Sequence, residues 1–226
     1  MKRLIATDYD GTLRINGKIS DSDREKIAAF RAAGNYFGIV TGRGSDFFKT
    51  VKDEGLQVDY LIVYTGALII DAEENVLFEA PIPFDDFVKL EKFFEKRADV
   101  EWYEKARAGE KYYQYYATCK DQTTALSVAA LAEKEFGGIF EYFVNGPHIN
   151  ICGKGISKAS GIREILKYYG IPEEAAAPVG DDYNDIRMIE ELNGWAVSSG
   201  RAEVVKLAPH VCESVGDLAQ ILIENG

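Results

Sequence analysis

Residues 4–13 read LIATDYDGTL, and this stretch sets the expected architecture. The apolar run Leu4 to Ala6 is typical of a buried strand, and two carboxylates, Asp8 and Asp10, follow at its end. Reaction chemistry in open parallel sheets collects at the carboxyl ends of strands. Two acids at such a place are costly unless a cation or phosphate chemistry uses them. We therefore predict a nucleophile at Asp8 and an acid/base partner at Asp10, although Asp and Gly also form ordinary turns.

The composition of the 226-residue chain is that of an ordinary globular protein, with 46% hydrophobic and 28% charged residues. Its net charge of −11 disfavours binding to nucleic acid or to an anionic membrane. No apolar run reaches the roughly 20 residues of a spanning helix, and no signal-type apolar region opens the chain. We expect a cytoplasmic protein that acts on a small molecule. The cysteines Cys119, Cys152 and Cys212 match no metal pattern and are expected to be reduced thiols.

Strands and helices alternate over the first third of the chain. After the first strand, the pattern predicts a capped helix over 20–33, a strand over 36–40, a helix over 46–54 and a strand over 60–63. Such alternation is typical of a parallel sheet with helical connections.

The middle of the chain breaks this alternation, beginning with a hairpin-like stretch over 68–78 and two prolines. We expect an α/β protein with a Rossmann-like parallel-sheet core over residues 1–80 and 150–226. A small α+β module would be inserted over residues 81–149. The core pattern is expected to resume with a strand through Cys152.

Four tyrosines surround Gln114 on a predicted strand of the inserted module. Side chains alternate between the two faces of a strand. Strict alternation would place Tyr112, Gln114 and Tyr116 on one face and Tyr113 and Tyr115 on the other.

Three further signals lie at loops after strands or at a helix start. Val40-Thr41-Gly42-Arg43 offers a hydroxyl and backbone N–H groups to phosphate oxygens. Lys158 follows a glycine-rich turn, where its ammonium would neutralise a phosphate, although a solvated helical lysine fits equally well. Gly180 to Asp185 forms an acid-rich loop directly after an apolar strand.

The acids of these loops suit a divalent cation. Bringing Asp8, Asp10, Asp181 and Asp185 to one sheet edge would raise their pKa values unless a hard cation lay among them. Mg²⁺ prefers oxygen ligands of this kind. The sequence therefore favours Mg²⁺ as a cofactor.

Together the Asp-x-Asp-Gly-Thr, Thr, Lys and Gly-Asp-x-x-Asn-Asp motifs resemble the haloacid dehalogenase superfamily of aspartate-nucleophile phosphatases, and they occur in that family's order. The insert resembles the cap of the Cof-like hydrolase branch, and its short length is similar to that of archaeal-type phosphoglycolate phosphatases. The resemblance covers essentially the whole chain. It implies a Mg²⁺-dependent phosphatase for a small phosphorylated metabolite, either a sugar phosphate or a phosphoglycolate-like acid.

The resemblance also implies a role for each motif residue. Asp8 would attack phosphorus to form an aspartyl-phosphate, and Asp10 would protonate the leaving alcohol and then deprotonate the hydrolytic water. Mg²⁺ would be held by the Asp8 carboxylate, the Asp10 carbonyl and Asp181, with Asp185 in or next to this shell. The phosphate-binding residues would be Thr41, Gly42, Lys158 and Asn184.

One position departs from the pattern of this branch, which commonly has Asn-Gly-Ala where this chain has Thr65-Gly66-Ala67. A hydroxyl lacks the paired donor and acceptor of a carboxamide, so the contacts of Thr65 with substrate or cap are expected to differ. Arg43 is expected to pair with a cap carboxylate or to reach substrate. The lone histidines His148 and His210 are expected to be structural.

Two other functions fit the same motifs. A phosphomannomutase-like phosphotransferase would deliver the phosphoryl group to a sugar instead of to water. A non-catalytic phospho-ligand sensor or receiver domain also combines acids, a hydroxyl residue and a lysine. Receivers, however, are shorter, lack an inserted cap and carry the phosphate-accepting aspartate after a later strand. The motifs leave the oligomeric state open.

Overall fold

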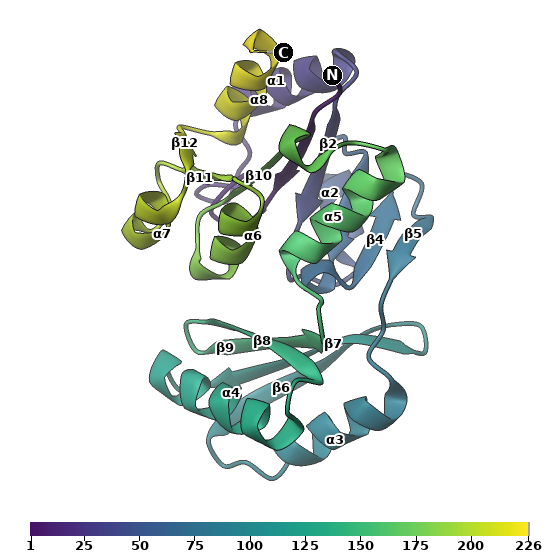
Figure 1. Ribbon diagram of the computed structural model, residues 1–226, viewed down its shortest axis with the longest axis vertical. Coiled ribbons are helices and arrows are strands. Elements are labelled where there is room, and N and C mark those ends of the chain that lie inside the picture. The colour runs from purple at the N-terminus through teal and green to yellow at the C-terminus, as the bar shows by residue number, and fades with distance from the viewer. Residues whose placement is uncertain (226) are drawn as a thin grey trace.

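The computed structural model describes residues 1–225 and is built around two sheets (Figure 1). The strands of the larger sheet are β1 (Leu4–Thr7), β2 (Tyr36–Val40), β3 (Tyr60–Val63), β4 (Leu68–Asp71), β5 (Val76–Glu79), β10 (Ala176–Gly180), β11 (Trp195–Val197) and β12 (His210–Cys212). Their order across the sheet is β12-β11-β10-β1-β2-β3-β4-β5. The strands from β12 to β3 run parallel, and β4 and β5 add an antiparallel hairpin at one edge. The predicted α/β class is confirmed.

Helices cover both faces of this sheet. One face carries α1 (Asp21–Ala32), α2 (Phe47–Asp53) and α8 (Val215–Glu224), and the other carries α5 (Lys158–Tyr169), α6 (Ile186–Glu191) and α7 (Ala202–Leu207). Short 3-10 turns complete the core: η1 (Tyr64–Gly66), η2 (Glu173–Ala175) and η3 (Tyr183–Asp185). In β1, Ile5 packs into one core and Leu4 and Ala6 into the other. Burial on both faces explains why β1 is continuously apolar.

The smaller sheet has four antiparallel strands in the order β6-β7-β9-β8. They are β6 (Val100–Ala108), β7 (Lys111–Cys119), β8 (Phe140–Asn145) and β9 (His148–Gly153). Helices α3 (Phe84–Phe94) and α4 (Gln122–Phe136) cover one face, and the other face is turned towards the larger sheet (Figure 1). We call this unit the cap.

Strand pairing corrects one expectation about the cap. The strand through Cys152 was expected to belong to the parallel sheet, but β9 pairs with β7 and β8. The expected boundary at residue 150 therefore falls inside a cap strand. We propose that the chain re-enters the core after Gly153.

A β-bulge overturns the expected alternation of the cap tyrosines. On β6, Ala106 pairs with Gln114 while the next residue, Arg107, pairs with Tyr112, so Tyr113 is an extra residue on β7. A bulge of this kind changes which face the neighbouring side chains point to. Tyr112 consequently stacks on Phe87 of α3, with ring centroids 4.0 Å apart, on the helix-covered face of the cap.

The η1 turn packs tightly against the start of α5. All three residues of η1 have a positive φ, and Gly66 reaches +111°. A Cβ at Gly66 would clash with the carbonyl oxygen of Ser157, and a Cβ at Gly161 would lie 3.0 Å from the Gly66 Cα. Only glycine fits such a backbone contact in this conformation. The turn after β3 is thus pressed directly onto the helix that begins at Lys158.

Within residues 1–225, no helix combines the length and the apolar character that crossing a bilayer would require.

Candidate active site

The candidate site forms where β1, β2 and β10 end side by side. Thr7 pairs with Ile39 of β2 and with Val179 of β10, so the loops after these strands start at the same sheet edge. The Asp8 N–H donates to the Val179 carbonyl over 2.9 Å. Parallel pairing therefore brings the loops of Asp8, Thr41 and Asp181 together, as their positions in the sequence predict.

Lys158 lies at the centre of the buried charges. Its side chain is only 3% exposed, and its Nζ donates to Asp8 Oδ1 and to Asp185 Oδ1, both over 2.6 Å. Burial alone would lower the pKa of Lys158, but the two carboxylates outweigh burial and hold this pKa above its ordinary value. Ser157 caps the helix by accepting from the Ser160 N–H at 3.1 Å. This capping bond at the start of α5 fixes the backbone from which the ammonium extends.

Three carboxylates surround this single ammonium. Oxygen atoms of Asp8, Asp181 and Asp185 all lie within 4.8 Å of one another. Burial, with help from neighbouring carboxylates, raises the pKa of Asp8 to about 7 despite the pull of Lys158. Burial likewise raises the pKa of Asp181 to about 6. One cation for three acids leaves excess negative charge, and the all-oxygen donor set fits a hard divalent cation.

Internal contacts orient two of these acids. Thr12 Oγ1 donates to Asp181 Oδ1 over 2.6 Å, and the carboxylate rests against Gly11, where a Cβ would clash with it. Asp185 is fully buried, and its Oδ2 accepts from the backbone N–H groups of Asp181 and Asp182 at 3.1 and 3.3 Å. Both Asp185 oxygens therefore have donors within the protein. Asp185 orients Lys158 and the loop that carries Asp181.

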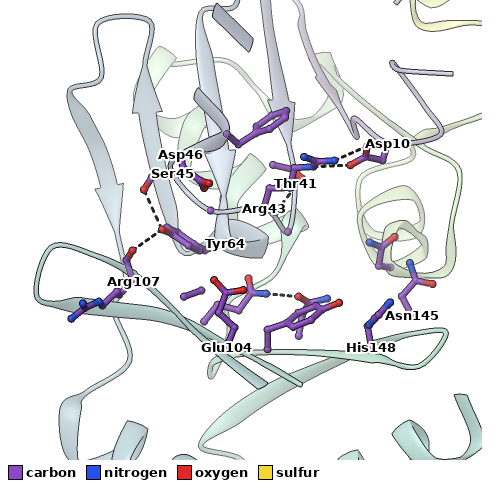
Figure 2. Close-up of a pocket in the computed structure, with 18 of the residues that line it drawn as sticks. Asp10, Thr41, Arg43, Ser45, Asp46, Tyr64, Glu104, Arg107, Asn145 and His148 are labelled. Carbon is purple, nitrogen blue, oxygen red and sulfur yellow. Dashed lines mark hydrogen bonds and ion pairs between the residues drawn. The ribbon is translucent and has the colours of Figure 1, made fainter. Parts of the chain in front are cut away.

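Asp10 lies apart from this cluster and pairs with Arg43 (Figure 2). The guanidinium donates twice, from Nε to Oδ2 at 2.8 Å and from Nη2 to Oδ1 at 2.9 Å. It also lies over the rings of Tyr9 and Phe47. Arg43 was expected to pair with a cap carboxylate or to reach substrate, and the carboxylate with which it pairs belongs to the core instead of to the cap. The reason is geometric, because the loops after β1 and β2 are neighbours.

A cavity of about 920 Å³ separates these core residues from the cap. Its core wall includes the predicted residues Asp8, Asp10, Thr41, Gly42, Arg43 and Asn184. Its cap wall includes Trp102, Glu104, Gln114, Tyr116, His148 and Asn150. In the described part of the chain, the buried Asn184 Oδ1 has no hydrogen-bond partner. We use "core wall" and "cap wall" for these two sets.

The cap wall contains groups that the sequence did not single out as functional. Trp102 meets the ring of Tyr116 edge-on, with centroids 5.6 Å apart, and Tyr116 stacks on His148 at 5.4 Å. The His148 Nδ1 and the Thr118 Oγ1 lie 3.1 Å apart in a hydrogen bond. His148 was expected to be structural, yet it faces the cavity (Figure 2). The pairing of β7 with β6 and with β9 brings these rings together.

Hydrogen bonds connect the core to the cap. The Tyr64 hydroxyl donates to the Arg107 carbonyl at 3.1 Å, and Thr65 Oγ1 donates to Gln114 Oε1 at 3.2 Å. On the other side, Asn145 Nδ2 donates to Asp182 Oδ2 at 3.2 Å. Thr65, which the sequence marked as unusual, is thus a cap contact.

Comparison with known proteins identifies the class to which this fold and site belong. A family model described as haloacid dehalogenase-like hydrolase matches residues 5–116 and 101–221. The chain belongs to this family, which confirms the resemblance carried by the motifs, and it is therefore a hydrolase.

Individual relatives agree with this assignment. The stress response protein YhaX of Bacillus subtilis is 26% identical over 259 residues, which cover 94% of this chain and 88% of YhaX. A protein of Streptococcus pyogenes named as a bifunctional phosphatase and peptidyl-prolyl cis-trans isomerase is 24% identical over 217 residues; the match covers 83% of this chain but only 46% of that protein. The solved structure of BT4131, a subclass IIB sugar phosphatase of the family, superposes with a TM-score of 0.79 at 22% identity and covers 100% of this chain and 99% of its own. At that identity the likeness concerns the fold.

Proposed function

We propose that this protein is a Mg²⁺-dependent phosphatase that hydrolyses a small phosphorylated metabolite of the sugar-phosphate type through an aspartyl-phosphate on Asp8. The observation that carries the proposal is the hydrogen bond from Lys158 to Asp8 Oδ1. This bond occupies one carboxylate oxygen and leaves Oδ2 as the nucleophile. Asp8 also lines the cavity, so substrate can reach it.

In the first step, Asp8 Oδ2 attacks phosphorus, the bond from phosphorus to the leaving oxygen breaks, and the Asp10 carboxyl gives its proton to that oxygen. In the second step, Asp10 takes a proton from water as the water oxygen attacks the aspartyl-phosphate. The bond between phosphorus and Oδ2 then breaks and frees Asp8. Thr41, Gly42, Asn184 and Lys158 would hold the phosphoryl oxygens through both steps.

Mg²⁺, held by Asp8, the Asp10 carbonyl and Asp181, would neutralise the phosphoryl oxygens and favour the ionised form of Asp8. Asp185 would lie beside this shell. The excess of buried carboxylates over ammonium groups supports this assignment.

The ion pair between Arg43 and Asp10 would break when substrate binds. In the absence of substrate, the guanidinium holds the Asp10 carboxylate by two hydrogen bonds. A bound phosphoryl group is a competing anion for the same guanidinium. Substrate binding would therefore release the Asp10 carboxyl for proton transfer.

The cavity supports a sugar ester over a two-carbon acid. Its volume of about 920 Å³ is far larger than phosphoglycolate would fill. The cap wall combines aromatic rings with amide and carboxylate groups, which suit the apolar faces and the hydroxyls of a sugar. The carboxylate of phosphoglycolate would instead lie close to the carboxylates of Glu104 and Asp182.

The experiment that tests this proposal is inorganic phosphate release from a panel of sugar phosphates, phosphoglycolate, glycerol phosphate and p-nitrophenyl phosphate. Each assay is run with Mg²⁺ and with excess chelator, for the wild type and for Asp8→Asn. We expect Mg²⁺-dependent release that is fastest with a sugar phosphate and absent in the variant. Full activity in Asp8→Asn would refute the mechanism. Formation of an isomeric sugar phosphate without phosphate release would instead indicate a phosphotransferase.

A further inference from the structure

Two buried side chains, Thr65 and Gln114, and the partly buried Asn150 form a chain of hydrogen bonds from the core to the cavity. Thr65 Oγ1 donates to Gln114 Oε1 over 3.2 Å, and Gln114 Nε2 donates to Asn150 Oδ1. Thr65 is 4% exposed and Gln114 2% exposed. The three residues come from η1, β7 and β9, which are far apart in the sequence.

The chain of bonds fixes which end of each amide points where. The Thr65 hydroxyl donates to Gln114 Oε1, so this oxygen points towards the core and the NH₂ group of Gln114 points towards Asn150. Asn150 accepts this hydrogen bond through Oδ1, which leaves its Nδ2 available as a donor. Asn150 lines the cavity, and among residues 1–225 its Nδ2 has no hydrogen-bond partner. The cap wall thus presents a preoriented donor.

The Asn150 amide group lies beside the loop proposed to bind phosphate. A Cβ added at Gly42 would be 3.8 Å from Asn150 Oδ1 and 3.4 Å from Thr65 Oγ1. Because residue 42 is glycine, no side chain separates Asn150 from this loop. A phosphoryl group held at Thr41 and Gly42 would place the first carbons of its leaving group beside the Asn150 amide.

We propose that Asn150 is a specificity-determining residue whose Nδ2 donates a hydrogen bond to a hydroxyl oxygen of the leaving group. Thr65 and Gln114 act as positioning residues that hold this amide in its donating orientation. The inference rests on the proposed phosphatase function and narrows its substrates to phosphate monoesters of polyhydroxylated alcohols. It also assigns a role to the unusual Thr65, because the Thr65 hydroxyl is the first donor in the chain of bonds.

The test compares two phosphate esters with the same four-carbon skeleton, erythritol 4-phosphate and n-butyl phosphate, which differ in their hydroxyls. For each protein, kcat/KM is measured with both esters, and their ratio is the preference for the polyol ester. The variants are Asn150→Leu, Thr65→Val and Thr65→Ser. Tyr142→Phe serves as the control, because it trims a cap side chain that packs with the helix-facing cluster.

We expect the wild type to prefer erythritol 4-phosphate. In Asn150→Leu this preference should fall about tenfold, which corresponds to the free energy of one hydrogen bond. Thr65→Val should lose roughly threefold, through KM and not through kcat, because the donor is still present but no longer oriented. Thr65→Ser restores the hydroxyl and should restore the preference. Tyr142→Phe should keep it.

A wild type without preference, or an unchanged preference in Asn150→Leu, would overturn the inference while leaving the phosphatase proposal intact. Loss in Thr65→Val that Thr65→Ser does not restore would remove the positioning role. If the wild type releases phosphate from neither ester nor from p-nitrophenyl phosphate, the proposed function itself fails and the inference fails with it.

Discussion

The core wall and the cap wall face the same cavity but are built in different ways. Behind the core wall, Asp8 is buried together with Lys158 and Asp185, and these side chains are no more than 11% exposed. In the cap wall, Trp102 is 51% exposed and its neighbours are rings and amides. A group of buried charges tolerates almost no change, because each ion offsets the desolvation cost of the others. The difference supports the proposal that the core carries the chemistry and the cap wall the selectivity.

The largest effect is expected from Lys158→Met, which removes the ammonium between two carboxylates. Phosphate release should fall at least about a thousandfold, because charge on the phosphoryl group loses its buried partner. The free energy of unfolding at neutral pH should fall by about 3 kcal/mol, since Asp8 and Asp185 are left facing each other. Steady-state kinetics and urea denaturation measure the two effects. A loss of activity below tenfold would contradict the role given to Lys158.

Metal removal should show a dependence on pH that arises from Asp8 and Asp181. The pKa values of Asp8 and Asp181, about 7 and about 6, lie above the ordinary value of 3.8. In metal-free protein these carboxyls therefore bind protons more tightly in the folded state. Their contribution to stability is complete below about pH 4 and is lost as the pH rises to about 7.

Mg²⁺ binds the ionised carboxylates, so it should raise the unfolding temperature by several degrees at pH 8 and by much less at pH 5. Thermal unfolding with Mg²⁺ or with excess chelator measures this difference. Equal shifts at the two pH values would show that the ion does not bind at the carboxylates of Asp8 and Asp181.

A smaller effect is expected from Arg43→Lys, at the edge of the core wall. Lysine keeps the positive charge but loses the fork that donates twice to Asp10. We expect kcat to fall about tenfold, with little change in stability because the pair is half exposed. Single-turnover kinetics should place the loss in the steps that need proton transfer. An unchanged kcat would mean that the exchange of Arg43 between Asp10 and the phosphoryl group does not affect catalysis.

The smallest effect is expected from Trp102→Ala, in the cap wall. Removing the ring should raise KM for a sugar phosphate by less than about fivefold and change stability by less than roughly 0.5 kcal/mol, since no buried partner is left unpaired. Kinetics and urea denaturation on the purified variant give both numbers. A loss as large as that of Lys158→Met would erase the distinction between the two walls.

Much of the core wall could be predicted from sequence because parallel strands place their carboxyl ends at one edge. Once β1, β2 and β10 were recognised as strands, the meeting of Asp8, Thr41 and Asp181 followed from the topology. The partners within that edge did not follow. The pairing of Arg43 with Asp10 depends on side-chain directions in two loops, which periodicity does not describe.

The cap wall could not be predicted in the same way, because register in an antiparallel sheet depends on turns and bulges. One extra residue at Tyr113 was enough to move Tyr112 to the other face. His148 and Asn150 were not predicted as cavity residues for a related reason, because β9 was expected to belong to the parallel sheet. Their sequence neighbours carry no signal of the cavity that they line.

The backbone contact between Gly66 and Gly161 bears on how this enzyme could be re-engineered. Libraries that vary Trp102, Tyr116 and His148 change side chains that end in open space, so most members should yield folded protein. A library that also varied positions 66 or 161 would fill with insoluble members, because even one methyl group forces the turn away from the helix. Directed evolution of substrate range should therefore sample the cap freely and leave both glycines fixed.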